Sequence, residues 1–378
     1  MASKLQSSGL ALPVVQRKNL PTSSLGFDWA MVVVSVWWLG GLFIDGWAHS
    51  NIPQLETFFT PWHAVFYSGY LAVAFTLLVR VLQNLHRAAS GPDGVAPSWG
   101  TIIRESLRGN RWLKSIPRGY ELTALGLVIF FFCGLGDMTW HILLGIEKNT
   151  EALLSPTHLG LALGIGLALT GPLRTAWRRA EAAPSWKRLG PAIFALTFTF
   201  SLLTFFTSYA SAVVSLWPLR DDFSSATRGI TNILLTTGLT MGFVLLAIRR
   251  WKLPFGTFAF MLGLNGVMMA VFYPPALLVS LPTGLLGGLA ADLLYRLLQP
   301  TLKRPESVRI FAFLVPLTFY IVYFVSLLIV GPIFFGNGIL WSPPFWAGAP
   351  VIAGFVGFLL SYVMIPPASQ PEQTDQEA

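Results

Sequence analysis

Four of the chain's five histidines stand in two stretches that repeat one order of ionisable residues. The first stretch, DGWAHSNIPQLETFFTPWH, contains Asp45, His49, Glu56 and His63. The second stretch, DMTWHILLGIEKNTEALLSPTH, contains Asp137, His141, Glu151 and His158. Both begin inside apolar sequence of membrane-spanning length, where each charged group costs about 2.5–3.5 kcal/mol to insert. Residues kept at that cost are candidates for a functional site.

The spacing within each stretch predicts that three side chains converge. An Asp and a His four residues apart share one face of a helix, about 6 Å apart along its axis. A hydroxyl residue followed by proline is typical of a helix start, so the last histidine falls in the first turn of a returning helix. The two predicted groups are Asp45, His49 and His63, and Asp137, His141 and His158.

Two neutral imidazoles and one carboxylate are a ligand set for a divalent transition metal, and they leave positions open for water, dioxygen or substrate. The positive end of the helix dipole favours the neutral imidazole for the histidine in the first turn. We therefore predict two metal sites, and we expect three further residues to serve as additional ligands or as hydrogen-bond partners of the ligands: Glu56, Glu151 and Cys133.

Three other interpretations of these residues remain open at this point. They can form a structural network of hydrogen bonds at the helix ends, or a path for protons or ions through the membrane. Paired histidines on facing helices are also ligands of b-type haem, although haem needs neither the Asp nor the Glu. The fifth histidine, His86, lies in a basic loop and is expected to be an ordinary interfacial residue. Asp292 can pair with Arg296 one turn later.

The composition predicts an all-α polytopic membrane protein, because 54% of the 378 residues are hydrophobic and only 11% are charged. Helices are the expected spanning elements, since lipid offers no partner to unpaired backbone groups. About ten segments have spanning length: Phe27 to His49, Pro61 to Leu82, Leu122 to Leu144, Pro156 to Trp177, Pro191 to Trp217, Gly229 to Ile248, Pro254 to Tyr273, Leu281 to Leu298, Val308 to Phe335 and Phe345 to Ile365.

The basic residues predict the orientation of these helices. In a ten-helix arrangement, 22 of the 25 Lys and Arg residues fall on one side, which is expected to be the cytoplasmic side. Both termini are then cytoplasmic, and the protein lies in the plasma (inner) membrane. The net charge of +8 is accounted for by this topology, so no nucleic-acid partner is expected. The first 26 residues lack the apolar core of a cleavable signal peptide.

The outer connectors indicate an internal repeat of five tandem helical hairpins. The stretches LETFFTPWH and TEALLSPTH are followed by weaker echoes in RDDFSSATR, ALLVSLPTG and GILWSPPFW. Only the first two keep the whole set of polar residues. We accordingly divide the chain into cytoplasmic tails (1–26 and 367–378), two metal-site hairpins (27–177) and three scaffold hairpins (190–366).

The paired motifs resemble those of one integral membrane subunit of the copper membrane monooxygenases, the particulate methane and ammonia monooxygenases. That protein carries Asp-x3-His on one helix with a further His about a dozen residues later, and a second unit with Asn in place of Asp. Here Asp45, His49 and His63 match the first unit, and Asp137, His141 and His158 match the second. The resemblance covers roughly Gly40 to Arg174, and this chain departs from it in having Asp137 and more predicted helices.

The resemblance implies copper, with iron and zinc as alternatives, and a monooxygenase-like oxidoreductase that works with further membrane or periplasmic subunits. Two other functions stay open. The motifs can capture metal for a transporter or a copper-handling protein, which would favour a polar path through the helices. They can also belong to a non-catalytic subunit whose polar hairpins dock a partner.

Overall fold

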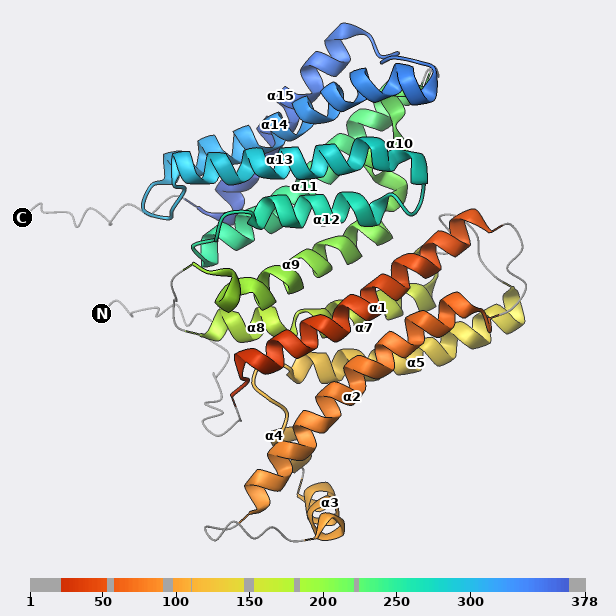
Figure 1. Ribbon diagram of the computed structural model, residues 1–378, viewed down its shortest axis with the longest axis vertical. Helices are drawn as coiled ribbons and strands as arrows, with labels where there is room; N and C mark the ends of the chain where they lie inside the picture. The colour runs from red at the N-terminus through yellow and green to blue at the C-terminus, as the bar shows by residue number, and fades with distance from the viewer. Residues whose placement is uncertain are drawn as a thin grey trace, which may run out of the picture.

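The computed structural model describes residues 22–52, 58–90, 98–109, 111–145, 153–179, 184–220 and 224–366, and these residues fold almost entirely into helices (Figure 1). Nine of the described helices are long and apolar enough to cross a membrane: Leu25–Asn51 (α1), Pro61–Ala89 (α2), Glu121–Leu144 (α5), Pro156–Arg178 (α7 and α8, joined at Thr170), Trp186–Phe206 (α9), Ser225–Arg250 (α11), Pro274–Leu298 (ending in α13, Leu277–Leu298), Pro305–Phe335 (beginning with α14, Pro305–Val330) and Pro343–Met364 (α15). The predicted all-α polytopic membrane fold is confirmed.

The tenth predicted span, Pro254 to Tyr273, is a shorter helix than expected. It forms α12, Thr257–Met269, which has 13 residues. Gly256 precedes it with a φ of +87°, a conformation that favours glycine, and Pro274 follows shortly after it. Asp292 of α13 accepts hydrogen bonds from two backbone N–H groups in the first turn of α12. The carboxylate of Asp292 thus satisfies a helix N-terminus, while Arg296, with which the sequence allowed it to pair, lies over the ring of Phe255.

Consecutive described helices pack along each other in two separate pairs, α1 with α2 and α5 with α7, and in one continuous series from α12 through α13 and α14 to α15. The helices of the predicted third hairpin, α9 and α11, have their main partners elsewhere. α11 packs chiefly against α15, and α9 lies between α1 and α12 in Figure 1. Because α9 contacts helices of both halves, it joins the two motif-bearing hairpins to the rest of the bundle.

Glycines allow the two motif-bearing hairpins to close tightly. A Cβ atom on Gly41 of α1 would lie 2.7 Å from the Cα atom of Phe66, and one on Gly69 of α2 would lie 2.5 Å from the Cα atom of Trp38. Between α5 and α7, a Cβ atom on Gly126 would lie 2.5 Å from the carbonyl oxygen of Gly164. The backbones are thus in direct contact at both crossings, as in the small-residue packing of membrane helices.

One buried carboxylate shows how this fold satisfies a charged group. Asp28, which is completely buried in the first turn of α1, accepts hydrogen bonds from Ser23 Oγ (2.7 Å), Tyr120 Oη (2.7 Å) and Thr175 Oγ1 (2.9 Å). Its Oδ2 atom also pairs with Arg179. Both oxygens therefore have hydrogen-bond donors, as burial requires.

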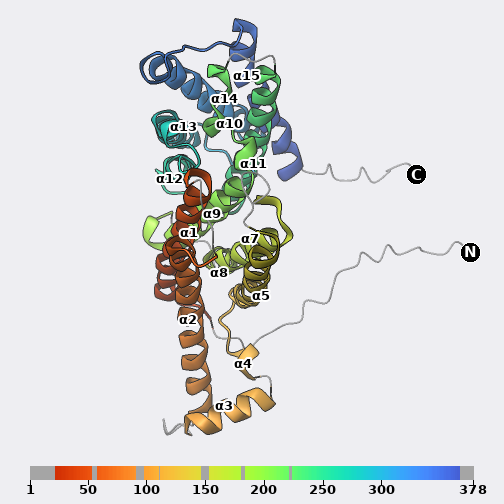
Figure 2. The ribbon, with the colours of Figure 1, turned by 90° about the vertical axis from the view of Figure 1, so that its right-hand side faces the viewer.

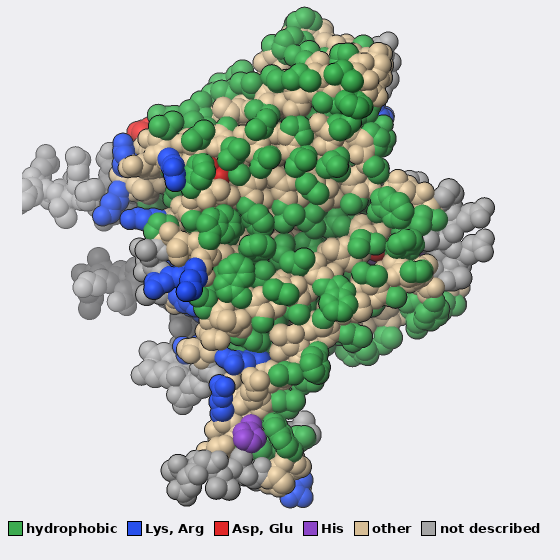
Figure 3. Space-filling model, in the orientation of Figure 1, with side chains coloured by type: hydrophobic (Ala, Val, Ile, Leu, Met, Phe, Trp, Pro, Cys, Tyr) green, Lys and Arg blue, Asp and Glu red, His purple; other side chains and the backbone are tan. Residues whose placement is uncertain are grey.

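The surface divides as a membrane protein's surface should. In Figure 3 the visible Lys and Arg side chains lie mostly along the left edge, where α1 begins and α15 ends in Figure 1, and hydrophobic side chains cover the face beside it. The C-terminal part of α2 extends past the other long helices and carries two short helices, α3 (Trp99–Arg108) and α4 (Arg111–Lys114), as Figures 1 and 2 show.

Candidate metal centre

The Asp-x3-His motifs lie on the last turns of two spanning helices. His49 stands one turn after Asp45 on α1, and its Nε2 atom is 3.7 Å from Asp45 Oδ2. Asp137 and His141 have the same relation on α5, with His141 Nε2 at 3.5 Å from Asp137 Oδ1. Each pair shares a helix face, as the spacing of four residues requires.

The returning helices begin where the sequence predicts. Thr60 is the N-cap of α2, and its Oγ1 accepts a hydrogen bond from the backbone N–H of His63 (3.2 Å). Ser155 is the N-cap of α7, and its Oγ accepts from the backbone N–H of His158 (3.4 Å). Proline follows each cap at the first helical position, where a missing N–H costs nothing. Both histidines therefore stand in the first turn of their helix.

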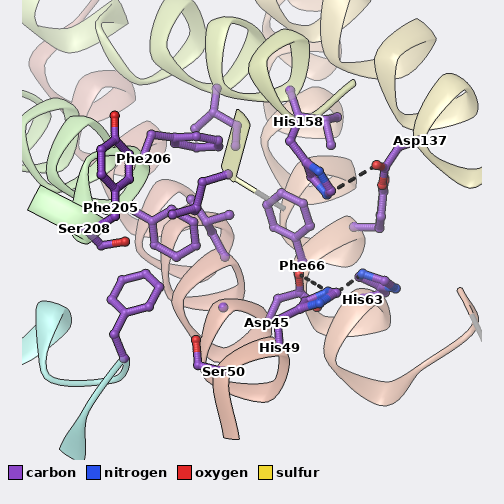
Figure 4. A pocket seen from close by; sticks show the side chains of 18 residues that line it. Asp45, His49, Ser50, His63, Phe66, Asp137, His158, Phe205, Phe206 and Ser208 are labelled. Carbon is purple, nitrogen blue, oxygen red and sulfur yellow. Dashed lines mark hydrogen bonds and ion pairs between the residues drawn. The ribbon is translucent and has the colours of Figure 1, made fainter. Parts of the chain in front are cut away.

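Asp, His and His converge within each hairpin. His63 Nε2 lies 3.4 Å from Asp45 Oδ1, and His158 Nε2 lies 3.3 Å from Asp137 Oδ1. In each group the three ligand atoms lie within 4.8 Å of one another. The predicted convergence is confirmed. We call the group of Asp45, His49 and His63 site 1, and the group of Asp137, His141 and His158 site 2; Figure 4 shows five of these six residues, labelled, around one pocket.

The far ring nitrogens of three histidines are held by neighbouring oxygen atoms. His63 Nδ1 lies 2.5 Å from the carbonyl oxygen of Phe58, and His141 Nδ1 lies 3.4 Å from that of Gly145. A carbonyl oxygen only accepts, so in the neutral ring Nδ1 carries the proton and the lone pair is on Nε2. His158 Nδ1 lies 2.6 Å from Ser155 Oγ. Outer contacts of this kind orient histidines that ligate metals.

Site 1 consequently brings two acceptors together. The Nε2 lone pair of His63 faces Asp45 Oδ1, a buried atom that has no hydrogen-bond partner among the described residues. Asp28, by contrast, has donors on both oxygens. A cation between Asp45 and His63 would remove the repulsion. Ligands about 2.1 Å from a tetrahedral ion stand about 3.4 Å apart, which is close to the separations found in both sites. The residues present therefore fit a metal ion.

The two sites are neighbours. The histidine rings form a row in which successive ring centroids are 5.6 Å (His49 to His63), 6.2 Å (His63 to His141) and 5.7 Å (His141 to His158) apart. The middle step joins a residue of α2 to a residue of α5, so it crosses from one hairpin to the other. Two motifs that are far apart in the sequence thus contribute to one polar cluster.

Three residues at this cluster were missed in the sequence. Tyr67 of α2 donates a hydrogen bond to Asp137 Oδ2 (3.4 Å), and Thr157 donates to Asp137 Oδ1 (3.2 Å). Phe58 supplies a carbonyl oxygen to His63, and its ring lies 4.8 Å from that histidine's ring. The signal for Tyr67 was its spacing, because it stands one helical turn after His63 and so shares its face.

The cluster forms one side of a cavity of about 250 Å³. Figure 4 shows Phe205, Phe206 and Ser208 on the opposite side. Phe205 and Phe206 belong to α9, and Phe272, which follows α12, also lines the cavity. The part of the chain predicted to be scaffold thus supplies a wall of the candidate site.

The remaining predicted residues are placed as follows. Glu56 and Glu151 lie outside the described residues, so their expected roles stay predictions. Cys133 does not belong to either group of clustered ligand atoms, and its Sγ lies over Gly160 at the crossing of α5 and α7. His86, expected in a loop, lies in the last turn of α2, away from both sites, with its ring centroid 5.1 Å from that of Trp99.

Comparisons of the chain with protein-family models, with curated proteins and with solved structures found no match. Its function must therefore be inferred from the site itself. The chain is a multi-pass helical protein of the membrane type with two Asp/His/His groups that can bind metal ions.

Proposed function

We propose that this protein is a membrane oxidoreductase that binds one copper ion at site 1 and one at site 2. The observation that supports this most directly is the pair of acceptors at site 1. His63 Nδ1 is occupied by a carbonyl oxygen, and the free Nε2 faces a buried carboxylate oxygen of Asp45 at 3.4 Å. A bound cation accounts for both atoms at once, and the resemblance to the copper membrane monooxygenases favours copper.

The donor set suits redox chemistry better than a purely structural ion. Structural zinc is held by four protein ligands, whereas two histidines and one carboxylate leave coordination positions open. A bound copper ion would supply single-electron transfer and an open position for a small molecule. In each site the carboxylate and the two imidazoles hold the ion, and Tyr67 and Thr157 orient the carboxylate of Asp137.

The setting of the sites also fits this role. They lie at the ends of α1 and α5, opposite the edge where the basic side chains gather in Figure 3. With the basic edge in the cytoplasm of a plasma membrane, both sites are near the outer surface. An ion there can be loaded from outside the cell without crossing the bundle.

The experiment is elemental analysis of the purified protein, combined with electron paramagnetic resonance and an absorption spectrum. We expect about two copper ions per chain and a Cu(II) signal with nitrogen ligands. His86→Ala is the matched control, because it removes the one histidine that is outside both sites. If the purified protein binds no metal, the two groups of residues form a structural hydrogen-bond network and the proposal is wrong. Zinc alone would contradict the redox function, and a haem Soret band would contradict the ligand assignment.

A further inference from the structure

The cavity beside sites 1 and 2 has a chemistry of its own. Its walls are mainly aromatic and aliphatic, with side chains from α1, α2, α7 and α9: Leu42, Phe66, Leu161, Ile165, Phe205 and Phe206. Polar side chains occur in two places. One is the metal cluster, with Ser50 next to His49 on α1, and the other is the opposite wall, with Ser208 and Tyr209. Ser50 and Tyr209 are exposed at the surface.

The size of the cavity limits what can occupy it. A cavity of about 150 Å³ lined by Leu, Ile and Phe binds benzene. The volume of about 250 Å³ found here therefore corresponds to a molecule with two fused aromatic rings or an aliphatic body of similar size. Apolar walls with a few placed polar groups are typical of sites for small organic ligands.

The polar groups determine how such a molecule would lie. One end would meet the carboxylates and imidazoles of the cluster, and the other would meet Ser208 and Tyr209 near the opening. The hydroxyls can satisfy one hydrogen-bonding group, while charged groups would be poorly solvated against Phe205 and Phe206. Figure 4 shows this arrangement, with Phe66 beside the cluster and Ser208 across the cavity.

We propose that this cavity binds an apolar molecule of about two fused rings, bearing at most one hydrogen-bonding group, with its body between α1, α7 and α9. As the substrate site of the oxidoreductase it rests on the proposed function, but binding itself requires only the cavity. The molecule enters near Ser50 and Tyr209, and its inner end faces sites 1 and 2.

The test uses a naphthyl diazirine as a photoaffinity probe on the full chain in lipid nanodiscs, with mass spectrometry of the labelled positions. We expect saturable labelling of cavity residues on α1, α7 and α9, and competition by naphthalene but not by the larger pyrene. Labelling spread over the lipid-facing surface, or labelling that naphthalene does not compete, would overturn the proposal. Labelling that naphthalene does not compete is also the result expected if a lipid acyl chain fills the cavity.

Two variants of α7 provide a matched pair. Ile165 is completely buried and lines the cavity, whereas Leu163 of the same helix is 55% exposed. Ile165→Trp should reduce competed labelling by about tenfold or more, because the larger indole would occupy part of the volume that the probe needs. Leu163→Trp should leave the labelling unchanged. Phe206→Ala enlarges the cavity and should let pyrene compete, which keeps the test decisive if Ile165→Trp does not fold.

The metal is measured separately in the same preparations. Competed labelling of a protein that binds no metal would support the cavity site and contradict the proposed oxidoreductase. Two copper ions without competed labelling would support the metal sites and overturn the cavity proposal. The two failures are therefore distinguishable.

Discussion

Sites 1 and 2 share one ligand design but differ in what surrounds it. In both, Asp and His follow each other on an outgoing helix, and a hydroxyl residue caps the returning helix that carries the second histidine. At site 2, Asp137 is 2% exposed and accepts hydrogen bonds from Tyr67 and Thr157. At site 1, the Asp45 side chain is 13% exposed, and its Oδ1 has no such partner among the described residues.

A repeated motif therefore does not make two equivalent sites. Asp45 Oδ1, which has no hydrogen-bond donor among the described residues, is available to an ion, whereas the hydrogen bonds to Asp137 partly neutralise its charge and fix its orientation. Site 1 should accordingly attract an ion strongly but exchange it readily through its more exposed side. Site 2 should hold its ion in a more rigid and more buried arrangement.

Loss of a ligand is the largest effect expected. His49→Ala should remove about one metal ion and leave site 2 loaded, and His141→Ala should do the reverse, because each triad supplies a complete ligand set. Metal content per chain, measured by elemental analysis, checks this. Loss of both ions from either variant would mean that the four histidines hold one shared centre.

The second largest effect is expected from removing the hydrogen bond by which Tyr67 of one hairpin contacts Asp137 of the other. Tyr67→Phe deletes the hydrogen bond to Asp137 and should lower metal affinity at site 2 by about 10–100-fold, with site 1 unchanged. Tyr70→Phe is the matched control, because Tyr70 lies on the same helix and donates to the carbonyl oxygen of Leu127 instead. Competition titration in the single-site variants His49→Ala and His141→Ala measures each affinity. Equal weakening of both sites would contradict the assignment of Tyr67 to site 2.

A smaller difference between the two sites is expected in the rate at which a soluble chelator removes their metal ions. The side chains of Asp45 and His49 are each 13% exposed, whereas those of Asp137 and His141 are 2% and 1% exposed. The first-turn histidines differ in the opposite sense, with His63 7% and His158 17% exposed, so two of the three ligands are more accessible at site 1. A soluble chelator should therefore strip site 1 several-fold faster than site 2. The measurement is the time course of metal release from His141→Ala, which retains site 1, and from His49→Ala, which retains site 2. Faster release from site 2 would reverse the comparison.

The helix caps should give the smallest effect. Thr60→Ala and Ser155→Ala should each cost about 1 kcal/mol of stability, because each leaves a backbone N–H of a first turn without its acceptor. Only Ser155→Ala should also weaken metal binding, since Ser155 Oγ lies against His158 Nδ1, while His63 Nδ1 is held by Phe58. Thermal unfolding without metal and affinity with metal provide the two readouts. Equal affinities in the two variants would refute the role of Ser155.

Much of this arrangement could be predicted from the sequence. Spacing of four residues, a hydroxyl residue before proline and long apolar segments depend on local chemistry, so the helices and the convergence within each hairpin followed from them. The closeness of the two sites did not follow, because it depends on how α2 packs on α5. The aromatic wall of Phe205 and Phe206 was missed for the same reason, since these residues look like ordinary membrane sequence.

Two local features also escaped the sequence. The short length of α12 depends on a glycine with positive φ before it and on Asp292, which lies on another helix and satisfies its first turn. The buried carboxylate of Asp28 accepts hydrogen bonds from Tyr120 and Thr175, which are far away in the chain. The buried carboxylates of Asp28 and Asp292 thus have partners that only the tertiary structure brings near.

The glycine crossings have a consequence for the chemistry at the two sites. Gly41 lies one turn before Asp45, and the backbones of α1 and α2 touch there and at Gly69. Helices in such close contact cannot slide past each other without a steric clash, and separating them would lose the packing contacts at the crossing. A copper ion at site 1 would therefore find Asp45, His49 and His63 in similar positions in its reduced and oxidised states. This would keep the reorganisation energy of electron transfer small.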